Sequence, residues 1–321
     1  MQLVGQTPMV KLTTIGRGLP HRLLAKCEFL NPAGSVKDRI GRYIVSRAEE
    51  AGLLLSGVST LVEATAGNTG VALAAAGAGR YRVIVTMSSK MGPEKEAMMR
   101  AWGAEVVRCP YEVPPGSPDS FINTARRIAN ATPHAYYVDQ FANPWNREAH
   151  EAATGPEILD QTAGQIAALV CGAGTGGTIM GVSRALRAAG CAATVVLADP
   201  EGSILADRLR GGTLSGHGYL VEGIGGDFVP DLLDFDFIDA AHTVTDRESI
   251  QMCLRLQREE GLWVGGSSGC AVAAAVRVAE QLPGPRSNIV VILPDGGSRY
   301  TSTIYDQRWR AERKVGAAVV S

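Results

Sequence analysis

Four turns of the sequence combine glycine with amine, amide or hydroxyl side chains that could bind or react with a small molecule. In the first, the segment NPAGSVKDR at positions 31–39 places Lys37 directly after a Pro-Gly-Ser turn. We expect Ser35 to cap the helix that follows, with Lys37 in the first helical turn. The helix dipole disfavours a cation there and would lower the pKa of the lysine, which suits a nucleophilic amine. A solvated lysine at the start of a surface helix is the alternative.

The second turn, EATAGNTG at positions 63–70, lies between an apolar run and a small-residue helix pattern. Its consecutive small residues would leave backbone N–H groups free at a helix N-terminus, which suits an anion such as a carboxylate. Thr65, Asn68 and Thr69 would add side-chain donors. An ordinary helix start with a glycine turn is the alternative interpretation.

The third turn, GAGTGGT at positions 172–178, follows an apolar run and opens a helix pattern. Many free N–H groups and two hydroxyls favour a phosphate-binding loop. The run also matches G-x-G-x-x-G through Gly172, Gly174 and Gly177, and Asp199 ends the next expected strand where a ribose-binding acid would lie. A nicotinamide-binding dehydrogenase of Rossmann type is therefore an alternative hypothesis.

The fourth turn, VGGSSGC at positions 264–270, leads into a small-residue helix pattern and is followed later by ILPDGGS at 292–298. Ser267 and Ser298 would offer neutral hydroxyls at the ends of late elements. Capping of a helix by serine explains either one alone.

Short apolar runs alternate with helix patterns along most of the chain. Strands are expected at 23–27, 60–63, 82–87, 105–108, 136–138, 167–171, 193–198 and 288–293. Helices are expected at 69–77, 93–102, 119–129, 147–161, 177–189, 247–260 and 269–281, with 201–234 as the longest irregular stretch. This order predicts an α/β fold of parallel sheets covered by helices on both faces. The turns that follow strands are where such sheets bind ligands, so the four turns could form one site.

Composition excludes several classes of protein. The 321 residues predict about two domains, and 31 basic against 32 acidic side chains give a net charge of −1 with no basic surface for nucleic acid. No apolar run is long enough to span a membrane and no signal peptide is evident, so we expect a cytoplasmic protein. Six dispersed cysteines are expected to be free thiols, and five histidines without ligand spacing predict no metal site.

Taken in order, these turns resemble the fold-type II pyridoxal-phosphate enzymes of the cysteine synthase and cystathionine β-synthase family. The resemblance runs from Gly5 to about Trp309. It rests on NPAGSVKDR at 31–39, TAGNTG at 65–70, Gln140 before Asn143-Pro144, GTGGT at 174–178, GIG at 223–225, GSSG at 266–269 and LPD at 293–295. Each motif is weak alone, and the ordered set is specific.

The resemblance implies a role for each matching residue. Lys37 would hold pyridoxal 5′-phosphate as a Schiff base and then act as the base at the substrate Cα. Asn68 would bind the 3′-oxygen of the cofactor, and Ser267 would face its pyridine nitrogen. The phosphate would be bound by Gly174, Thr175, Gly176, Gly177 and Thr178. The substrate carboxylate would be bound by Thr65, Ala66, Gly67, Asn68 and Thr69 with Gln140, and Gly223 would lie near the amino group.

The same resemblance implies a two-domain fold like that of the tryptophan synthase β-subunit, and a homodimer. Residues 1–35 and 141–321 would form a larger domain that binds the cofactor phosphate. Residues 36–140 would form a smaller mobile domain that carries Lys37 and the asparagine loop (residues 65–69) and closes on the substrate.

The implied chemistry is β-replacement. A neutral hydroxyl at Ser267 leaves the pyridine nitrogen unprotonated, which makes the cofactor a weaker electron sink and favours prompt loss of a β-leaving group. Serine or O-acetylserine would lose its β-substituent and a thiol would add. Segments at 24–28, 199–206, 221–230 and 306–309 resemble cystathionine β-synthase, which favours homocysteine as acceptor and cystathionine as product.

Several alternatives stay open. A cysteine synthase would use sulfide, and a specialised β-substituted alanine synthase would use an amine. The Rossmann hypothesis explains one turn of the four, and a non-enzymatic relative is disfavoured by intact Lys37, Asn68 and Ser267. Ala66 stands where the family commonly has serine, and the loss of that hydroxyl favours an activated serine as donor. Gln6 stands where the family usually has asparagine, and we expect this change to have little effect. Because the printed sequence ends at Ser321 and has no long segment before Gly5, regulation by adenosylmethionine or haem is not expected.

Overall fold

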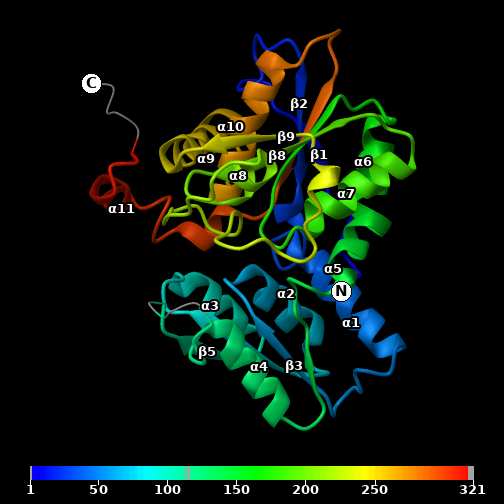
Figure 1. Cartoon of the computed structure of the whole chain (residues 1–321), viewed down its shortest axis with the longest axis vertical. Coiled ribbons are helices and arrows are strands. Elements are labelled where there is room, and N and C mark those ends of the chain that lie inside the picture. The colour runs from blue at the N-terminus through cyan, green and yellow to red at the C-terminus, as the bar shows by residue number, and fades with distance from the viewer. Residues whose placement is uncertain (1, 112, 114–115, 317–321) are drawn as a thin grey trace.

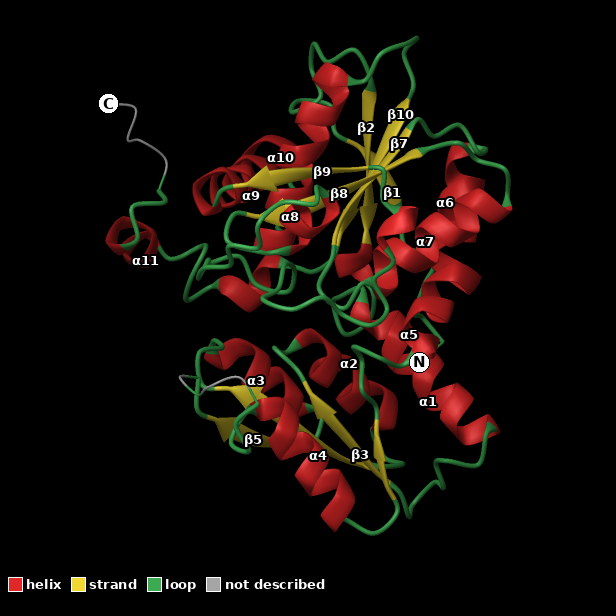
Figure 2. Ribbon diagram, in the orientation of Figure 1, coloured by secondary structure: helices red, strands yellow, loops and turns green. Residues whose placement is uncertain are grey.

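The computed structural model describes residues 2–111, 113 and 116–316, and it contains two sheets, each flanked by helices (Figures 1 and 2). The larger sheet has the order β1-β2-β10-β7-β8-β9. Its strands are β1 (Met9–Lys11), β2 (Arg22–Cys27), β7 (Ala168–Gly172), β8 (Thr194–Pro200), β9 (Ala240–Val244) and β10 (Asn288–Leu293). All neighbours are parallel except β1 and β2, which pair antiparallel.

The smaller sheet has four parallel strands in the order β5-β4-β3-β6. They are β3 (Thr60–Ala64), β4 (Arg82–Ser88), β5 (Glu105–Cys109) and β6 (Ala135–Tyr137). On one face lie α1 (Lys37–Glu50), α2 (Asn68–Gly77) and α3 (Pro93–Ala101), and α4 (Phe121–Ala131) covers the other. The prediction of an α/β fold with two largely parallel sheets is therefore confirmed.

Helices cover both faces of the larger sheet because its central strands are largely apolar. In β10, five of the six residues are buried, as expected for a strand that packs against helices on both sides. One face is covered by α9 (Asp246–Glu260) and α10 (Gly266–Gln281). The other is covered by α6 (Gly155–Thr162) and α7 (Gly177–Ala188). Short α5 (Pro144–Ala149), α8 (Leu205–Leu209) and α11 (Gln307–Glu312) complete the described helices.

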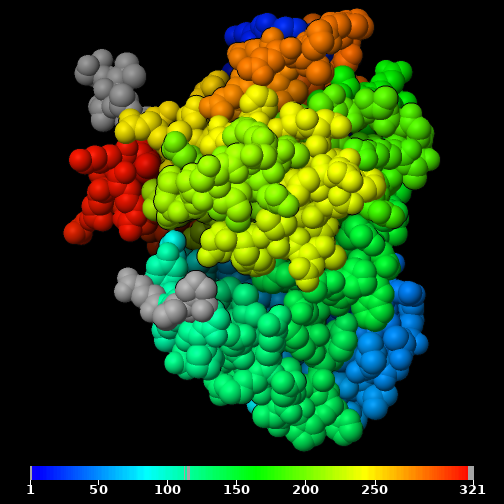
Figure 3. All heavy atoms as spheres, in the orientation of Figure 1, coloured from blue at the N-terminus to red at the C-terminus, as the bar shows by residue number. Residues whose placement is uncertain are grey.

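Each expected strand corresponds to an observed one, but the structure adds β1 and β9. Three residues are too few to give β1 a pattern, and β9 begins with two alanines, which have low strand propensity. The single helix expected at 147–161 is instead α5 and α6 joined by a π-helical segment, His150–Thr154. The stretch 201–234, expected to be irregular, contains α8, and its yellow-green atoms lie on the face of the molecule seen in Figure 3.

All four strands of the smaller sheet lie within the range 36–140 that we expected for the smaller domain. The domain limits themselves stay a prediction, and Met1 and residues 317–321 lie outside the described part of the chain. No helix in the described residues is both long and apolar enough to cross a membrane.

A buried cluster of four charged side chains joins the start of α1 to the larger sheet. Arg39 of α1 donates to Glu28 (Nε–Oε2, 2.6 Å) and to Glu157 of α6 (Nη2–Oε2, 2.7 Å). Lys26 of β2 also donates to Glu157 Oε2 at 2.7 Å. Burial alone would raise the pKa of Glu157, but these hydrogen bonds hold that pKa at about 2. Glu157 therefore stays ionised across the physiological range.

Glu157→Gln removes one of two negative charges and leaves Lys26 and Arg39 with Glu28 alone. Breaking one partner of a buried pair costs about 3–5 kcal/mol, so the urea midpoint of unfolding should fall sharply. As control, Arg308→Ala breaks the exposed Arg308–Glu312 pair, and its free energy of unfolding should change by less than about 1 kcal/mol. Equal stabilities for the two variants would contradict the importance of the cluster.

Candidate active site

One narrow pocket between the two sheets is lined by residues from all four predicted turns. The predicted residues that line it are Lys37, Asn68, Gly174, Thr175, Gly176, Thr178, Gly223 and Ser267. Cys171 and Pro294, which lie at or just beyond the carboxyl ends of β7 and β10, complete part of its wall. Segments more than 200 positions apart in the sequence therefore meet here, as expected at this edge of parallel sheets.

Lys37 is the first residue of α1, and its side chain lines the pocket. The prediction that Ser35 caps this helix is wrong: the N-cap is Val36, although Ser35 Oγ accepts a hydrogen bond from the Lys37 N–H at 3.2 Å. Burial lowers the pKa of Lys37 to about 8, while the nearby Cys171 and Asp295 act in the opposite sense. The expected lowering is present, but its main cause is loss of water and not the helix dipole.

The loop between β7 and α7 forms a cradle of backbone donors. Within the described chain, no backbone N–H of residues 174–178 has a hydrogen-bond acceptor. Gly176 is the N-cap of α7 with φ of 83°, and no side chain caps the helix. Free N–H groups at a helix N-terminus bind phosphate well, so this loop fits the phosphate of pyridoxal phosphate.

Close packing explains why this loop needs glycine. A Cβ at Gly174 would lie 2.4 Å from the carbonyl oxygen of Gly223, and a Cβ at Gly177 would lie 2.0 Å from Asn146 Oδ1. Gly177 itself begins α7 behind the loop and is not among the lining residues.

Two residues that the sequence did not indicate support the hydroxyls of this loop. Asn146 Nδ2 donates to Thr175 Oγ1 at 2.9 Å and to the carbonyl of Gln140 at 2.8 Å. His150 Nε2 lies 3.2 Å from Thr178 Oγ1. Burial holds the pKa of His150 well below its usual value, so it is neutral. In the sequence, the only sign of these two residues is that polar side chains recur after Asn143-Pro144 within an otherwise ordinary helix pattern.

The asparagine loop lies at the start of α2, with Thr65, Gly67 and Thr69 buried and Ala66 partly buried. Thr69 Oγ1 donates to Gln140 Oε1 at 2.5 Å, and Gln140 Nε2 donates to the carbonyl of Ala64 at 2.8 Å. Gln140 is therefore hydrogen-bonded to the asparagine loop, although it lies 72 positions beyond Asn68 in the sequence. Gly67 has φ of 139°, and a Cβ there would lie 2.3 Å from Lys95 Cδ.

Ser267 lies in the first turn of α10 and lines the pocket, but it does not cap the helix. The helix begins at Gly266, three residues before the expected start, and its N-cap is Gly265. Ser267 is 3% exposed, and its hydroxyl has no hydrogen bond to another described residue. Its neutral hydroxyl is therefore available to a ligand in the pocket. Ser298, the other predicted serine, does not line it.

Asp199 does not support nucleotide binding. Its carboxylate is fully buried and accepts the N–H of Ala206 at 2.8 Å. Burial raises the pKa of Asp199 to about 6. Because this carboxylate is used inside the fold and does not line the pocket, the ribose contact required by the Rossmann hypothesis is missing.

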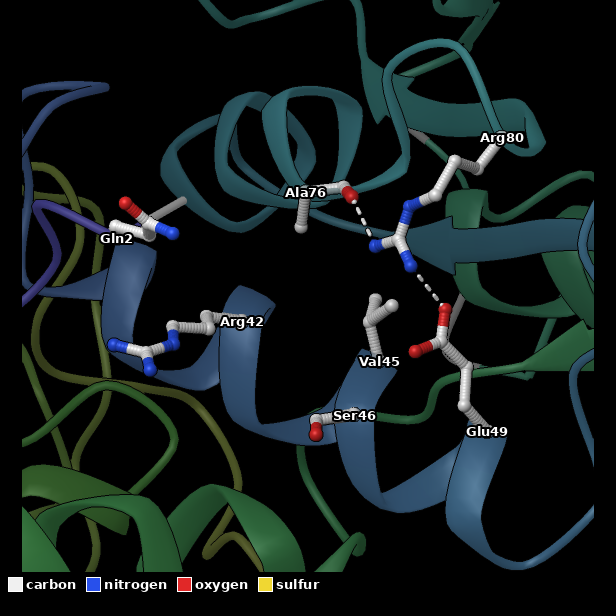
Figure 4. A pocket seen from close by; sticks show the side chains of 7 residues that line it. All are labelled: Gln2, Arg42, Val45, Ser46, Glu49, Ala76 and Arg80. Atoms are coloured by element: carbon white, nitrogen blue, oxygen red, sulfur yellow. Dashed lines mark hydrogen bonds and ion pairs between the residues drawn. The ribbon is translucent and has the colours of Figure 1, made fainter.

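A wider hollow of about 260 Å³ lies elsewhere, on the outer side of α1 and α2 (Figure 4). Its lining includes Arg42 and Glu49 of α1 with Arg80, and Arg80 is bound to Glu49 and to the carbonyl of Ala76. None of the predicted site residues contributes to it.

The chain matches the family model described as pyridoxal-phosphate dependent enzyme over residues 1–295. It therefore belongs to that family, with the fold-type II arrangement of two largely parallel sheets. It is similar to the cystathionine beta-synthase of Oryctolagus cuniculus, at 44% identity over 98% of this chain and 57% of the relative. The chain thus spans little more than half the length of that relative.

Two other proteins are similar to this chain over most of its length. Cysteine synthase 1 of Neurospora crassa is 40% identical over 98% of this chain and 85% of the relative. The crystal structure titled O-acetylserine dependent cystathionine beta-synthase from Helicobacter pylori superposes with a TM-score of 0.86 at 35% identity. That similarity covers 95% of this chain and 97% of the other.

The lowered pKa of Lys37 predicts a pH-dependent capture of the cofactor. Below pH 8 the amine is mostly protonated and cannot attack the cofactor aldehyde, so the rate constant for binding should rise about tenfold per pH unit and level off above 8. Stopped-flow absorbance with apoprotein and pyridoxal phosphate measures it. Lys37→Ala should give no stable visible band, whereas Lys90→Ala, at an exposed lysine, should behave as the wild type. A flat profile would contradict the assignment.

Proposed function

We propose that this chain is a pyridoxal-phosphate-dependent β-replacement enzyme that joins the side chain of an activated serine to a thiol, with homocysteine as acceptor and cystathionine as product. The observation that carries the proposal is the meeting of Lys37, the 174–178 cradle and Ser267 in one pocket. The similarity to cystathionine β-synthases over nearly the whole chain supports it.

Lys37 serves as the covalent anchor and then as the general base. With a pKa of about 8, its amine can accept the proton from the Cα of the bound amino acid near neutral pH. When bound, pyridoxal phosphate supplies an electron sink for the negative charge at that carbon. The 174–178 cradle would hold the phosphate, and Ser267 would offer the ring nitrogen a neutral hydroxyl that does not protonate it.

The asparagine loop holds the substrate carboxylate. In the described structure, the N–H groups of Asn68 and Thr69 at the start of α2 have no acceptor, which suits an anion. The hydrogen bonds of Gln140 with Thr69 and with the carbonyl of Ala64 stabilise the conformation of the loop in which these N–H groups are free. Gly223 leaves room beside the amino group because it has no side chain. These groups orient Cα toward Lys37 and exclude water from the reacting atoms.

O-acetylserine is favoured over serine as the donor. Ala66 lies in the loop at a position where a serine hydroxyl would help a poor leaving group depart, and acetate needs no such help. The similar Helicobacter pylori protein is described as O-acetylserine dependent, which supports the same choice for this chain.

An ion pair beside the pocket favours an amino acid over sulfide as acceptor. Lys95 of α3 donates to Glu222 Oε2 at 2.5 Å, between the asparagine loop and the Gly223 turn. A zwitterion such as homocysteine could exchange with this pair, its carboxylate bound by Lys95 and its ammonium by Glu222. Sulfide has neither a carboxylate for Lys95 to bind nor an ammonium for Glu222 to bind. A cysteine synthase remains the second candidate, favoured by the Neurospora crassa relative.

A homodimer, closure of the 36–140 domain on the substrate and a cytoplasmic location belong to the same proposal. The free state of all six cysteines is compatible with a reducing compartment.

An absorbance titration of the purified holoenzyme tests the donor and the acceptor in turn. The protein should have a visible band that changes on addition of O-acetylserine more readily than with serine. The changed band should then decay with homocysteine and release cystathionine, identified by mass spectrometry. Faster decay with sulfide, with cysteine as product, would establish a cysteine synthase, and decay with an amine alone would establish a specialised β-substituted alanine synthase. A protein that binds no pyridoxal phosphate would overturn the whole proposal.

Glu222→Gln tests the acceptor site separately. Loss of a charged hydrogen bond to the homocysteine ammonium should raise the KM for homocysteine about tenfold, with little change in the KM for sulfide. Glu280→Gln, at an exposed acid near the end of α10 that does not line the pocket, is the control and should leave both values unchanged. An equal effect of Glu222→Gln on both acceptors would place Glu222 outside acceptor recognition.

A further inference from the structure

Arg299 lies between two of the loops that form the candidate active site. It belongs to the 3-10 segment Gly297–Tyr300 after β10 and is 4% exposed. Its Nε donates to Asn68 Oδ1 at 2.9 Å, and its Nη2 donates to the carbonyl of Ala33. One buried guanidinium thus ties the loop before Lys37 to the asparagine loop, which come from different parts of the chain.

Asp295 binds the nitrogen of the same Asn68 amide. Asn68 Nδ2 donates to Asp295 Oδ2 at 2.7 Å, and Tyr300 donates to the same oxygen at 2.7 Å. Asp295 is 1% exposed, and its carbonyl accepts a hydrogen bond from the N–H of Gly265 at 3.0 Å, which anchors its backbone beside Ser267. Because a guanidinium can only donate and a carboxylate accepts, the orientation of the Asn68 amide is fixed by its two neighbours.

The loop before Lys37 is shaped to receive Arg299. Gly34 has φ of 86°, and a Cβ there would lie 2.7 Å from Arg299 Nη1, so a side chain at this position would displace the guanidinium. The N–H of Ala33 donates to Asp38 Oδ2 at 2.5 Å while the carbonyl of Ala33 accepts from Arg299. Arg299 is therefore built into the loop that presents Lys37.

We propose that Arg299 and Asp295 are positioning residues that hold the Asn68 amide so that it offers only an N–H to the pocket. The proposal rests on the proposed use of pyridoxal phosphate. With Oδ1 bound to Arg299 and one Nδ2 hydrogen bound to Asp295, the second Nδ2 hydrogen is the polar group left for a ligand. A donor stabilises the ionised form of the cofactor's phenolic oxygen. An amide free to rotate could instead turn its oxygen toward that group and disfavour ionisation.

The absorbance spectrum of the holoenzyme tests this without any substrate. Bound pyridoxal phosphate absorbs in the visible when its phenolic oxygen is ionised and in the near ultraviolet when it is neutral. Arg299→Ala should lower the ratio of the visible to the near-ultraviolet band about tenfold at fixed pH, at unchanged cofactor content per chain. Arg299→Lys, which keeps one donor, should recover part of the ratio, and Asp295→Asn should lower it.

Arg277→Ala is the control, because Arg277 is another arginine that joins two elements, through the carbonyl of Thr243 and Glu248, and it is only partly buried. Its spectrum should equal that of the wild type. Unchanged ratios in Arg299→Ala and Asp295→Asn would overturn the proposal. If Arg299→Ala does not fold, Arg299→Lys and Asp295→Asn decide: a lowered ratio in either supports positioning, and the wild-type ratio in both refutes it. A colourless wild type would refute the proposed function instead, so the two failures are distinguishable.

Discussion

Arg39 lies two residues beyond Lys37 in α1, and two buried carboxylates from other elements bind its guanidinium. These ion pairs fix the direction in which α1 leaves the larger sheet, and hence the direction of Lys37. A lysine amine loses its charge readily only where water is scarce, so the helix that carries it must start inside the protein. The charged cluster makes that start possible, because it anchors the first turn of α1 without a capping side chain.

Close backbone approaches then build the pocket around this amine. Gly174 contacts the Gly223 turn, Gly177 contacts Asn146, and Gly34 contacts Arg299. At each position a Cβ would fall inside the contact distance of a neighbour that belongs to another part of the site. The high glycine content of the turns therefore serves packing between loops, as well as the exposure of N–H donors toward a phosphate.

Much of this arrangement could be predicted from the sequence, because the rule that ligands collect after parallel strands is local. It placed Lys37, Asn68, the 174–178 loop and Ser267 in turns, and the structure brings these four together. The Ser35 cap was wrong, because α1 begins one residue later, after Val36. Burial, the largest cause of the lowered Lys37 pKa, depends on distant residues and has no local pattern. Arg299 and Asn68 lie 231 positions apart, and no local pattern could have paired them.

Besides the charged cluster at the start of α1, several contacts join the part of the chain with the smaller sheet to the part with the larger sheet. Asn68 meets Asp295, Lys95 meets Glu222, and Glu94 of α3 accepts the N–H of Ser302 at 2.8 Å. Separation of the sheets would break each of these bonds, and the partners would gain water in exchange. Glu222 and Glu94 already contact solvent, whereas Asp295 and Lys95 are buried, so opening would break bonds made by two buried groups. Asp295, which orients the asparagine amide, is thus also one of the groups that resist opening of the pocket.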